Sequence, residues 1–171
     1  MQAVELTNVC DGLLFRIFPS RREENEGCVI ALASVHPGAG VTQLTNALAE
    51  AVRRCGDESA VSLCCRYLKI GDSGPGFQES VFSTLQAIRH RRRYAFIDCG
   101  SMATSQDIIR LAPLVDGVIL VVEANRTQRE QIEYAERTVE AVNGRILGFI
   151  LNKRTYVVPE WCHRVMTSVG L

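Results

Sequence analysis

Residues Ser34 to Asn46 read Ser-Val-His-Pro-Gly-Ala-Gly-Val-Thr-Gln-Leu-Thr-Asn, and they follow the apolar run Cys28 to Ala33. A short apolar run of this kind predicts a buried strand. The glycines Gly38 and Gly40 predict a tight turn after that strand, and a helix is expected to begin directly behind them. The stretch therefore predicts a strand, a glycine-rich turn and a helix start in immediate succession.

Such a turn predicts a place where phosphate could bind. Unpaired backbone N–H groups gather at a helix N-terminus, where the helix dipole favours negative charge. The phosphate-binding pattern G-x-x-x-x-G-K-[ST] has a lysine before its hydroxyl residue, whereas Gly40-Val41-Thr42 has valine there. We therefore expect phosphate to be held loosely or not at all. The loop residues expected to line the site are Pro37, Gly38, Ala39, Gly40, Val41 and Thr42.

The composition predicts one globular domain. The chain has 171 residues, of which 47% are hydrophobic and 22% charged, enough for a sizeable core. Basic and acidic residues both number 19, so no overall charge draws the protein to nucleic acid or anionic lipid. Without a long apolar run or a secretory leader, we expect a cytoplasmic protein with no direct membrane insertion. The seven cysteines lie mostly in apolar runs, which predicts reduced, buried thiols.

Apolar runs alternate with amphipathic stretches along the rest of the chain. The expected strands lie at 28–33, 60–65, 94–100, 117–123 and 146–151, and the expected helices near 44–55, 77–88, 108–112, 132–142 and 159–169. This alternation predicts a parallel sheet between two helix layers, with ligands at the C-terminal strand ends. Residues expected to meet in one crevice at those ends are Thr42, Asp98, Glu123 to Thr127 and Asn152.

Composition also suggests an interpretation of the N-terminal residues and of a basic cluster. Residues 1–27 are expected to stand apart from the domain at 28–171, and a candidate docking helix covers Met1 to Phe18. His90 to Arg93 form a basic cluster after an amphipathic helix. We interpret this cluster as a solvated last turn that the helix dipole stabilises, because no aromatic residues are interleaved as in a nucleic-acid patch.

Four stretches of the chain resemble the cytoplasmic ATPase domain of bacterial tyrosine kinases (BY-kinases), which belong with the MinD/ParA deviant-Walker ATPases. The stretches are Ser34 to Ala49, Tyr94 to Ser101, Asp116 to Thr127 and Gly148 to Lys153. The resemblance implies a three-layer P-loop NTPase-like α/β fold. It also implies a site for ATP or ADP with Mg²⁺, in which Thr42 and Asp98 lie on the metal side and Asn152 faces the adenine.

The departures from the family pattern imply lost catalysis. Val41 removes the ammonium that neutralises phosphate charge in phosphoryl transfer. The segment Ala60 to Arg66 lacks the aspartate with which the family's second strand ends, and the chain shows neither a C-terminal tyrosine cluster nor the family's N-terminal oligomerisation motif. No catalytic residue is therefore assigned. The resemblance implies an impaired homologue in capsule or exopolysaccharide biosynthesis, bound to the cytoplasmic part of a membrane chain-length or export protein.

Alternatives stay open on the residues alone. One is an active ATPase or tyrosine kinase of the same pathway, in which His36 or a partner's arginine supplies the missing charge. Another is a structural interaction module that binds no nucleotide, and homo-oligomer formation is a further expectation of the family resemblance. Thr42 is also an ordinary helix-capping residue, Asp98 could cap the following segment, and Asn152 fits common turn chemistry.

Overall fold

The computed structural model describes residues 27–54, 59–68 and 77–154. Five parallel strands form one sheet in the order β2-β3-β1-β4-β5. The strands are β1 (Cys28–Ser34), β2 (Val61–Cys64), β3 (Tyr94–Ser101), β4 (Gly117–Glu123) and β5 (Ile146–Asn152). The predicted α/β fold is confirmed. The helices expected at 1–18 and 159–169 lie outside the described residues, and the division at residue 27 stays a prediction.

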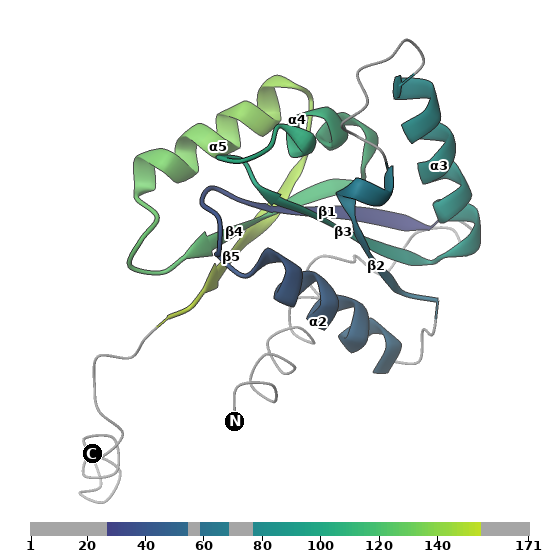
Figure 1. Cartoon of the computed structure of the whole chain (residues 1–171), viewed down its shortest axis with the longest axis horizontal. Coiled ribbons are helices and arrows are strands. Elements are labelled where there is room, and N and C mark those ends of the chain that lie inside the picture. The colour runs from purple at the N-terminus through teal and green to yellow at the C-terminus, as the bar shows by residue number, and fades with distance from the viewer. Residues whose placement is uncertain (1–26, 55–58, 69–76, 155–171) are drawn as a thin grey trace, which may run out of the picture.

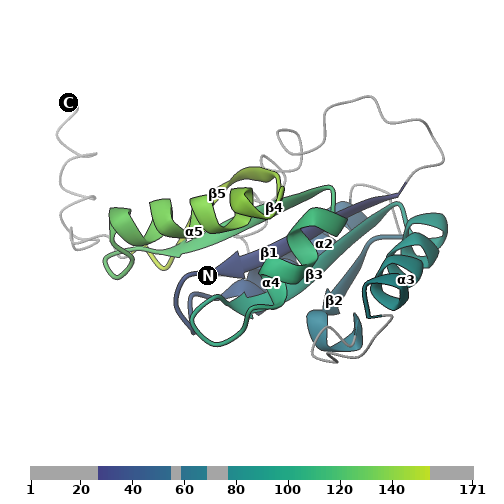
Figure 2. The ribbon, with the colours of Figure 1, turned by 90° about the horizontal axis from the view of Figure 1, so that it is seen from above.

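Helices cover both faces of the sheet, as the alternating pattern predicted. They are α2 (Val41–Arg54), α3 (Phe77–Arg91), α4 (Asp107–Leu111) and α5 (Arg129–Ala141), with 3-10 turns η1 (Cys65–Leu68) and η2 (Ala112–Leu114). Figure 1 shows α2 on one face and α3, α4 and α5 on the other. Figure 2 shows α4 between α5 and α3 on that second face. Among the described helices, none is long and apolar enough to cross a membrane.

Strand β1 lies at the centre of the sheet, and all seven of its residues are buried. Its side chains alternate between two cores, as the period of a strand requires. Val29 and Ala31 pack on the side of α3, α4 and α5, whereas Ile30 and Leu32 pack on the side of α2. Full burial of a large aliphatic side chain contributes about 1.5–3 kcal/mol. The end of β1, where the loop begins, is therefore held firmly from both faces.

One detail of the expected elements, the burial of β2, is corrected. Strand β2 was expected to be buried, but its four residues are half-buried because it is an edge strand that pairs only with β3 among the described residues. The helix expected near 108–112 is α4, which ends at Leu111 before Pro113, and Pro113 lies inside the 3-10 turn η2 that follows. Proline lacks an N–H group yet fits the start of a helical turn, which explains its place there.

The cysteines and the basic cluster agree with their interpretations. Of the cysteines in the described part of the chain, Cys28, Cys65 and Cys99 are buried and form no disulfide, and Cys64 is half-buried. The side chains from His90 to Arg93 are exposed at the end of α3 and just after it. The cluster is thus a solvated helix end, as expected.

An ionic contact ties α3 to the start of β1. The Oδ2 atom of Asp116 accepts hydrogen bonds from the backbone N–H of Val29 at 2.7 Å and from Arg89 at 3.3 Å. The backbone N–H of Asp116 donates in turn to the Val29 carbonyl at 2.9 Å. Arg89 also donates to the carbonyl of Leu114 at 3.2 Å. Because the Arg89 and Asp116 side chains are only 14% and 18% exposed, this contact is part of the interior.

Candidate functional site

The loop between β1 and α2 lines a pocket of about 450 Å³, together with residues from the end of β3 and with Lys153. Gly38 and Gly40 have φ angles of +85° and +92°, a conformation in which other residues are strained. Within the described residues, the backbone N–H groups of Gly38, Ala39 and Gly40 donate to no protein group. These three donors are therefore available to an acceptor in the pocket. The arrangement is the one expected of a phosphate-binding loop.

Thr42 and Asp98 meet beside the loop. The pairing of Leu32 with Asp98 in the β1–β3 ladder brings the end of β3 to the loop. The Thr42 hydroxyl donates to Asp98 Oδ2 at 2.5 Å, and Asp98 Oδ1 accepts from the backbone N–H of Gly100 at 2.9 Å. A hydroxyl and a carboxylate are oxygen donors of the kind that Mg²⁺ prefers, with waters and phosphates as its other ligands. The pair fits the predicted metal side of a nucleotide site, and its role as a Mg²⁺ site stays a prediction.

Val41 begins α2 at the position where the phosphate-binding pattern has lysine. Its side chain is 5% exposed and belongs to the core between α2 and the sheet, with Ile30 and Leu48. The residue also contributes to the pocket wall, but as an apolar surface. Position 41 therefore supplies no charge to the pocket and contributes to the stability of the core.

Asn152, at the end of β5, holds the loop from the side. Its Nδ2 group donates to the Ala39 carbonyl at 2.8 Å. A Cβ atom at position 40 would lie too close to the same Nδ2 group, so the Asn152 side chain would have to shift, and the φ angle of +92° itself favours glycine there. The structure brings Asn152 to the loop as predicted from its strand end, and its contact with adenine stays a prediction.

His36 of the loop contacts helix α5. Its Nε2 atom is 3.0 Å from Gln131 Oε1 on α5, and the same oxygen accepts the backbone N–H of Gln128 at 3.0 Å. An amide oxygen only accepts, so His36 Nε2 carries the proton in this contact. His36 is not among the residues that line the pocket. The structure thus shows a bond between the loop and α5, and the proposed replacement charge at His36 stays untested.

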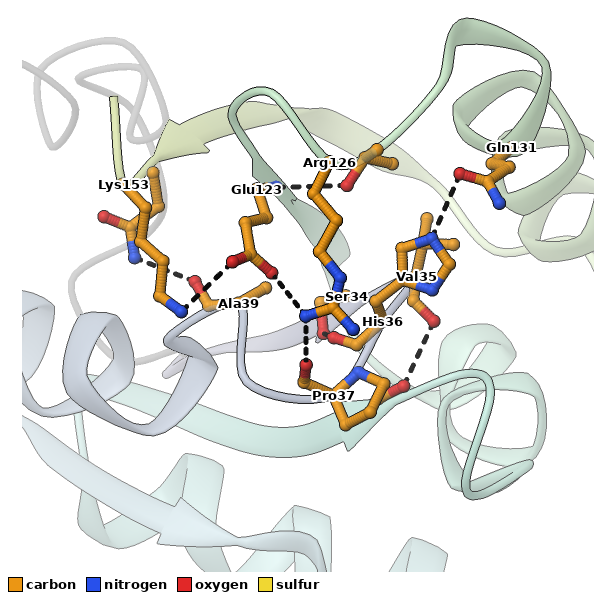
Figure 3. A network of polar contacts seen from close by, with 12 residues as sticks. Ser34, Val35, His36, Pro37, Ala39, Glu123, Arg126, Gln131 and Lys153 are labelled. Atoms are coloured by element: carbon orange, nitrogen blue, oxygen red, sulfur yellow. Dashed lines mark hydrogen bonds and ion pairs between the residues drawn. The ribbon is translucent and has the colours of Figure 1, made fainter. Parts of the chain in front are cut away.

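A charged cluster beside the loop was not recognised from the sequence. Glu123 Oε1 is 3.2 Å from Lys153 Nζ, and Glu123 Oε2 is 3.0 Å from Arg126, which also donates to the Pro37 carbonyl at 3.2 Å. Figure 3 shows Lys153 and Arg126 on either side of Glu123. The hydrogen bond from Lys153, helped by Arg126, holds the pKa of the Glu123 carboxyl below its usual value. From the sequence, Glu123 was expected at a strand end, whereas no function in the site was assigned to Lys153.

Thiols lie at the end of β2, where the family resemblance implied an aspartate in an active relative. The Cys65 thiol donates to Asp107 Oδ2 at 3.3 Å. A hydrogen bond from Cys99 lowers the pKa of Cys65 despite burial, and the same bond together with burial raises the pKa of Cys99. No residue of β2 or η1 lines the pocket in the described part of the chain. The second strand therefore brings no carboxylate to the loop there.

The sequence comparisons find similarity to a succinoglycan biosynthesis transport protein and to a tyrosine-protein kinase. No known family profile matches the chain. Over 69 residues, 40% of the chain, it is 32% identical to the succinoglycan biosynthesis transport protein ExoP of Rhizobium meliloti, of which the match covers 9%. A match of the same length is 35% identical to the tyrosine-protein kinase CpsD of Streptococcus agalactiae serotype III, of which it covers 30%. The chain thus spans less than a third of each of these relatives.

Solved structures show the same fold. The kinase domain of the Escherichia coli tyrosine kinase ETK matches with a TM-score of 0.67 and 15% identity over 92% of this chain and 78% of that one. The kinase domain of VpsO matches with a TM-score of 0.67 and 21% identity over 90% of this chain and 95% of that one. Fold and loop define a P-loop kinase-type α/β domain. In sequence, 69 residues of the chain are similar to ExoP and to the tyrosine-protein kinase CpsD.

Proposed function

We propose that this domain is a catalytically impaired BY-kinase-like ATPase homologue that acts as a regulatory or binding component of capsule or exopolysaccharide biosynthesis and export. The observation that carries the proposal is the burial of Val41, 5% exposed, at the position of the phosphate-binding lysine. The matched relatives are described as a succinoglycan biosynthesis transport protein and as a tyrosine-protein kinase, which supports the pathway.

The lining of the pocket supports binding without turnover. Phosphoryl transfer depends on positioned charges and on a group that activates the attacking water or hydroxyl. Among the described residues that line the pocket, none is a carboxylate or a histidine. Thr42 and Asp98 would hold Mg²⁺, which neutralises phosphate charge when it is bound. The unpaired loop amides would hold an anion, but no lining group is placed to take a proton from a nucleophile.

The proposed partner is the cytoplasmic part of a membrane chain-length or export protein. This proposal rests on the similarity to ExoP, whose name describes a transport protein. A domain that binds a nucleotide without consuming it would report on nucleotide supply to such a partner, and its own location would be peripheral at the inner membrane. Neighbouring genes for a glycosyltransferase and a chain-length protein would support this assignment.

The test compares ATP hydrolysis and Mg-ATP binding by the unaltered protein, by Val41→Lys and by Asp98→Ala. We expect no hydrolysis above background from the unaltered protein. Val41→Lys should bind triphosphate more tightly by about tenfold or more, because one charge-assisted interaction contributes about 1.5–3 kcal/mol. Hydrolysis by the unaltered protein that Asp98→Ala abolishes would overturn the proposal. Unchanged affinity in Val41→Lys would mean that the pocket does not admit phosphate.

One observation favours a second candidate, an active ATPase with a non-standard loop. Thr42 and Asp98 remain together at 2.5 Å, as a working metal side requires. The hydrolysis assay separates the two candidates directly. A structural module without nucleotide differs from both, because nucleotides would not raise its melting temperature, whereas a partner's cytoplasmic tail would.

A further inference from the structure

We propose that Lys153 supplies the positive charge of the pocket and binds a phosphate group there, in place of the lysine that position 41 lacks. The inference rests on the proposed function, because it assumes that the pocket binds a phosphate-bearing ligand without turnover. The ligand class is inorganic phosphate or the terminal phosphate of a nucleotide.

Lys153 is placed in the pocket together with the loop. Among the described residues that line this pocket, it carries the only charged side chain. Gly38, Ala39 and Gly40 line the same pocket, and their backbone N–H groups have no acceptor among the described residues. Donors without acceptors and one ammonium group, with no carboxylate among the lining residues, make a site suited to an anion.

The backbone at the end of β5 brings two consecutive residues to the loop. Successive side chains of a strand point to opposite faces, so Asn152 and Lys153 would normally diverge. Lys153 instead has a φ angle of +57°, which breaks the extended conformation directly after the strand. Asn152 consequently bonds the Ala39 carbonyl while Lys153 lines the pocket. Lysine in this left-handed conformation is less favourable than glycine, a local strain of the kind found at functional positions.

The charges around Lys153 leave it free to take a second partner. An ammonium group has three donor positions, and Glu123 at 3.2 Å accepts one of them. Glu123 has one charge and is shared between Lys153 and Arg126, so the three groups together have a net charge of +1. The Lys153 side chain is 48% exposed, so it is accessible to an anion from solvent. A phosphate could bind Lys153 without breaking its contact with Glu123.

The sequence makes a selective chemical test available. Of the 19 basic residues only two are lysines, Lys69 and Lys153. An amine-acylating reagent, followed by mass spectrometry, therefore reports on Lys153 with Lys69 as the internal standard. We expect inorganic phosphate and ADP, each with and without Mg²⁺, to slow acylation of Lys153 relative to Lys69, and adenosine to have no effect. Protection by ADP but not by free phosphate would assign the ligand to nucleotides.

Binding measurements on variants complete the test. Lys153→Gln should weaken phosphate or ADP binding by about tenfold to a hundredfold, the effect of losing one charge-assisted hydrogen bond. Lys153→Arg should retain most of the affinity, and Val41→Lys should restore it in the Lys153→Gln background. Glu123→Gln should tighten binding, because it removes the competing negative charge. Arg129→Gln, on a highly exposed part of α5, is the matched control with no expected effect.

The outcomes separate this inference from the proposed function. Equal affinity of Lys153→Gln and the unaltered protein, or no binding of phosphate and ADP by folded protein, would overturn the role of Lys153. A melting curve for each variant establishes that it is folded. Hydrolysis of ATP by the unaltered protein would overturn the proposed function, yet it would leave the dependence of binding on Lys153 as a separate result.

Discussion

Asp116 offers a quantitative test of how the start of β1 is held in place. Its Oδ2 atom accepts the Val29 N–H at 2.7 Å and the Arg89 guanidinium at 3.3 Å. Asp116→Ala leaves a buried N–H group unpaired, at a cost of about 2 kcal/mol. It also removes the counter-ion of Arg89, and a partly buried pair of this kind contributes about 1 kcal/mol more. We expect a loss of about 3 kcal/mol, large against a total stability of about 5–15 kcal/mol.

Urea unfolding measures this loss, because a denaturant slope of about 2 kcal/mol/M converts 3 kcal/mol into a midpoint shift of about 1.5 M. Asp116→Asn is the matched control. It keeps an oxygen acceptor for Val29 and loses only the charge, so it should cost about 1 kcal/mol. If Asp116→Ala costs less than 1 kcal/mol, or if Asp116→Asn costs as much as Asp116→Ala, the hydrogen bond to Val29 is not the main contribution and the reasoning is wrong.

Three further predictions concern the loop and its surroundings. Gly40→Ala should lower the free energy of unfolding by about 1–3 kcal/mol, because φ is +92° and Asn152 occupies the space; no change in urea unfolding would contradict this. Asn152→Ala should speed amide hydrogen exchange at Leu44, whose N–H donates to the Gly40 carbonyl of the loop at 3.0 Å, without changing exchange in α3. Lys153 and Arg126 lower the folded-state pKa of Glu123, so the stability difference from Glu123→Gln should stay constant above the unfolded pKa of about 4.3 and shrink as pH falls further; a constant difference down to about pH 3 would refute it.

The sheet and its order of elements were predictable because each strand has its own local signal. Residues 117–123 form an apolar run without alternation, and β4 has these bounds because helices cover both of its faces. The loop was equally clear from Gly38 and Gly40. The half-burial of β2 was not predictable, since an edge position depends on strand order and not on the apolar content of the strand.

The contacts around the pocket depend on topology in the same way. The sequence showed Glu123 and Lys153 at two strand ends, but only the pairing of β4 with β5 sets them 3.2 Å apart. The positive φ angle of Lys153 has no signal in the residue itself, because lysine rarely adopts it. The sequence did offer one signal, because the chain has only two lysines and one of them, Lys153, directly follows β5. The partner of His36 was not predictable from the sequence either, because Gln131 lies 95 residues away along the chain.

Because Asn152 of β5 donates to the Ala39 carbonyl, the conformation of the loop depends on β5, which is an edge strand among the described residues. In the described residues β5 pairs only with β4, so it is the strand that local opening should release most readily from this end of the sheet. Whenever β5 opens, the loop loses its lateral support and Lys153 leaves the pocket with the strand. Opening of the edge and loss of the anion site would then be one cooperative event. A partner that pairs with or covers β5 would thereby regulate ligand affinity without touching the pocket.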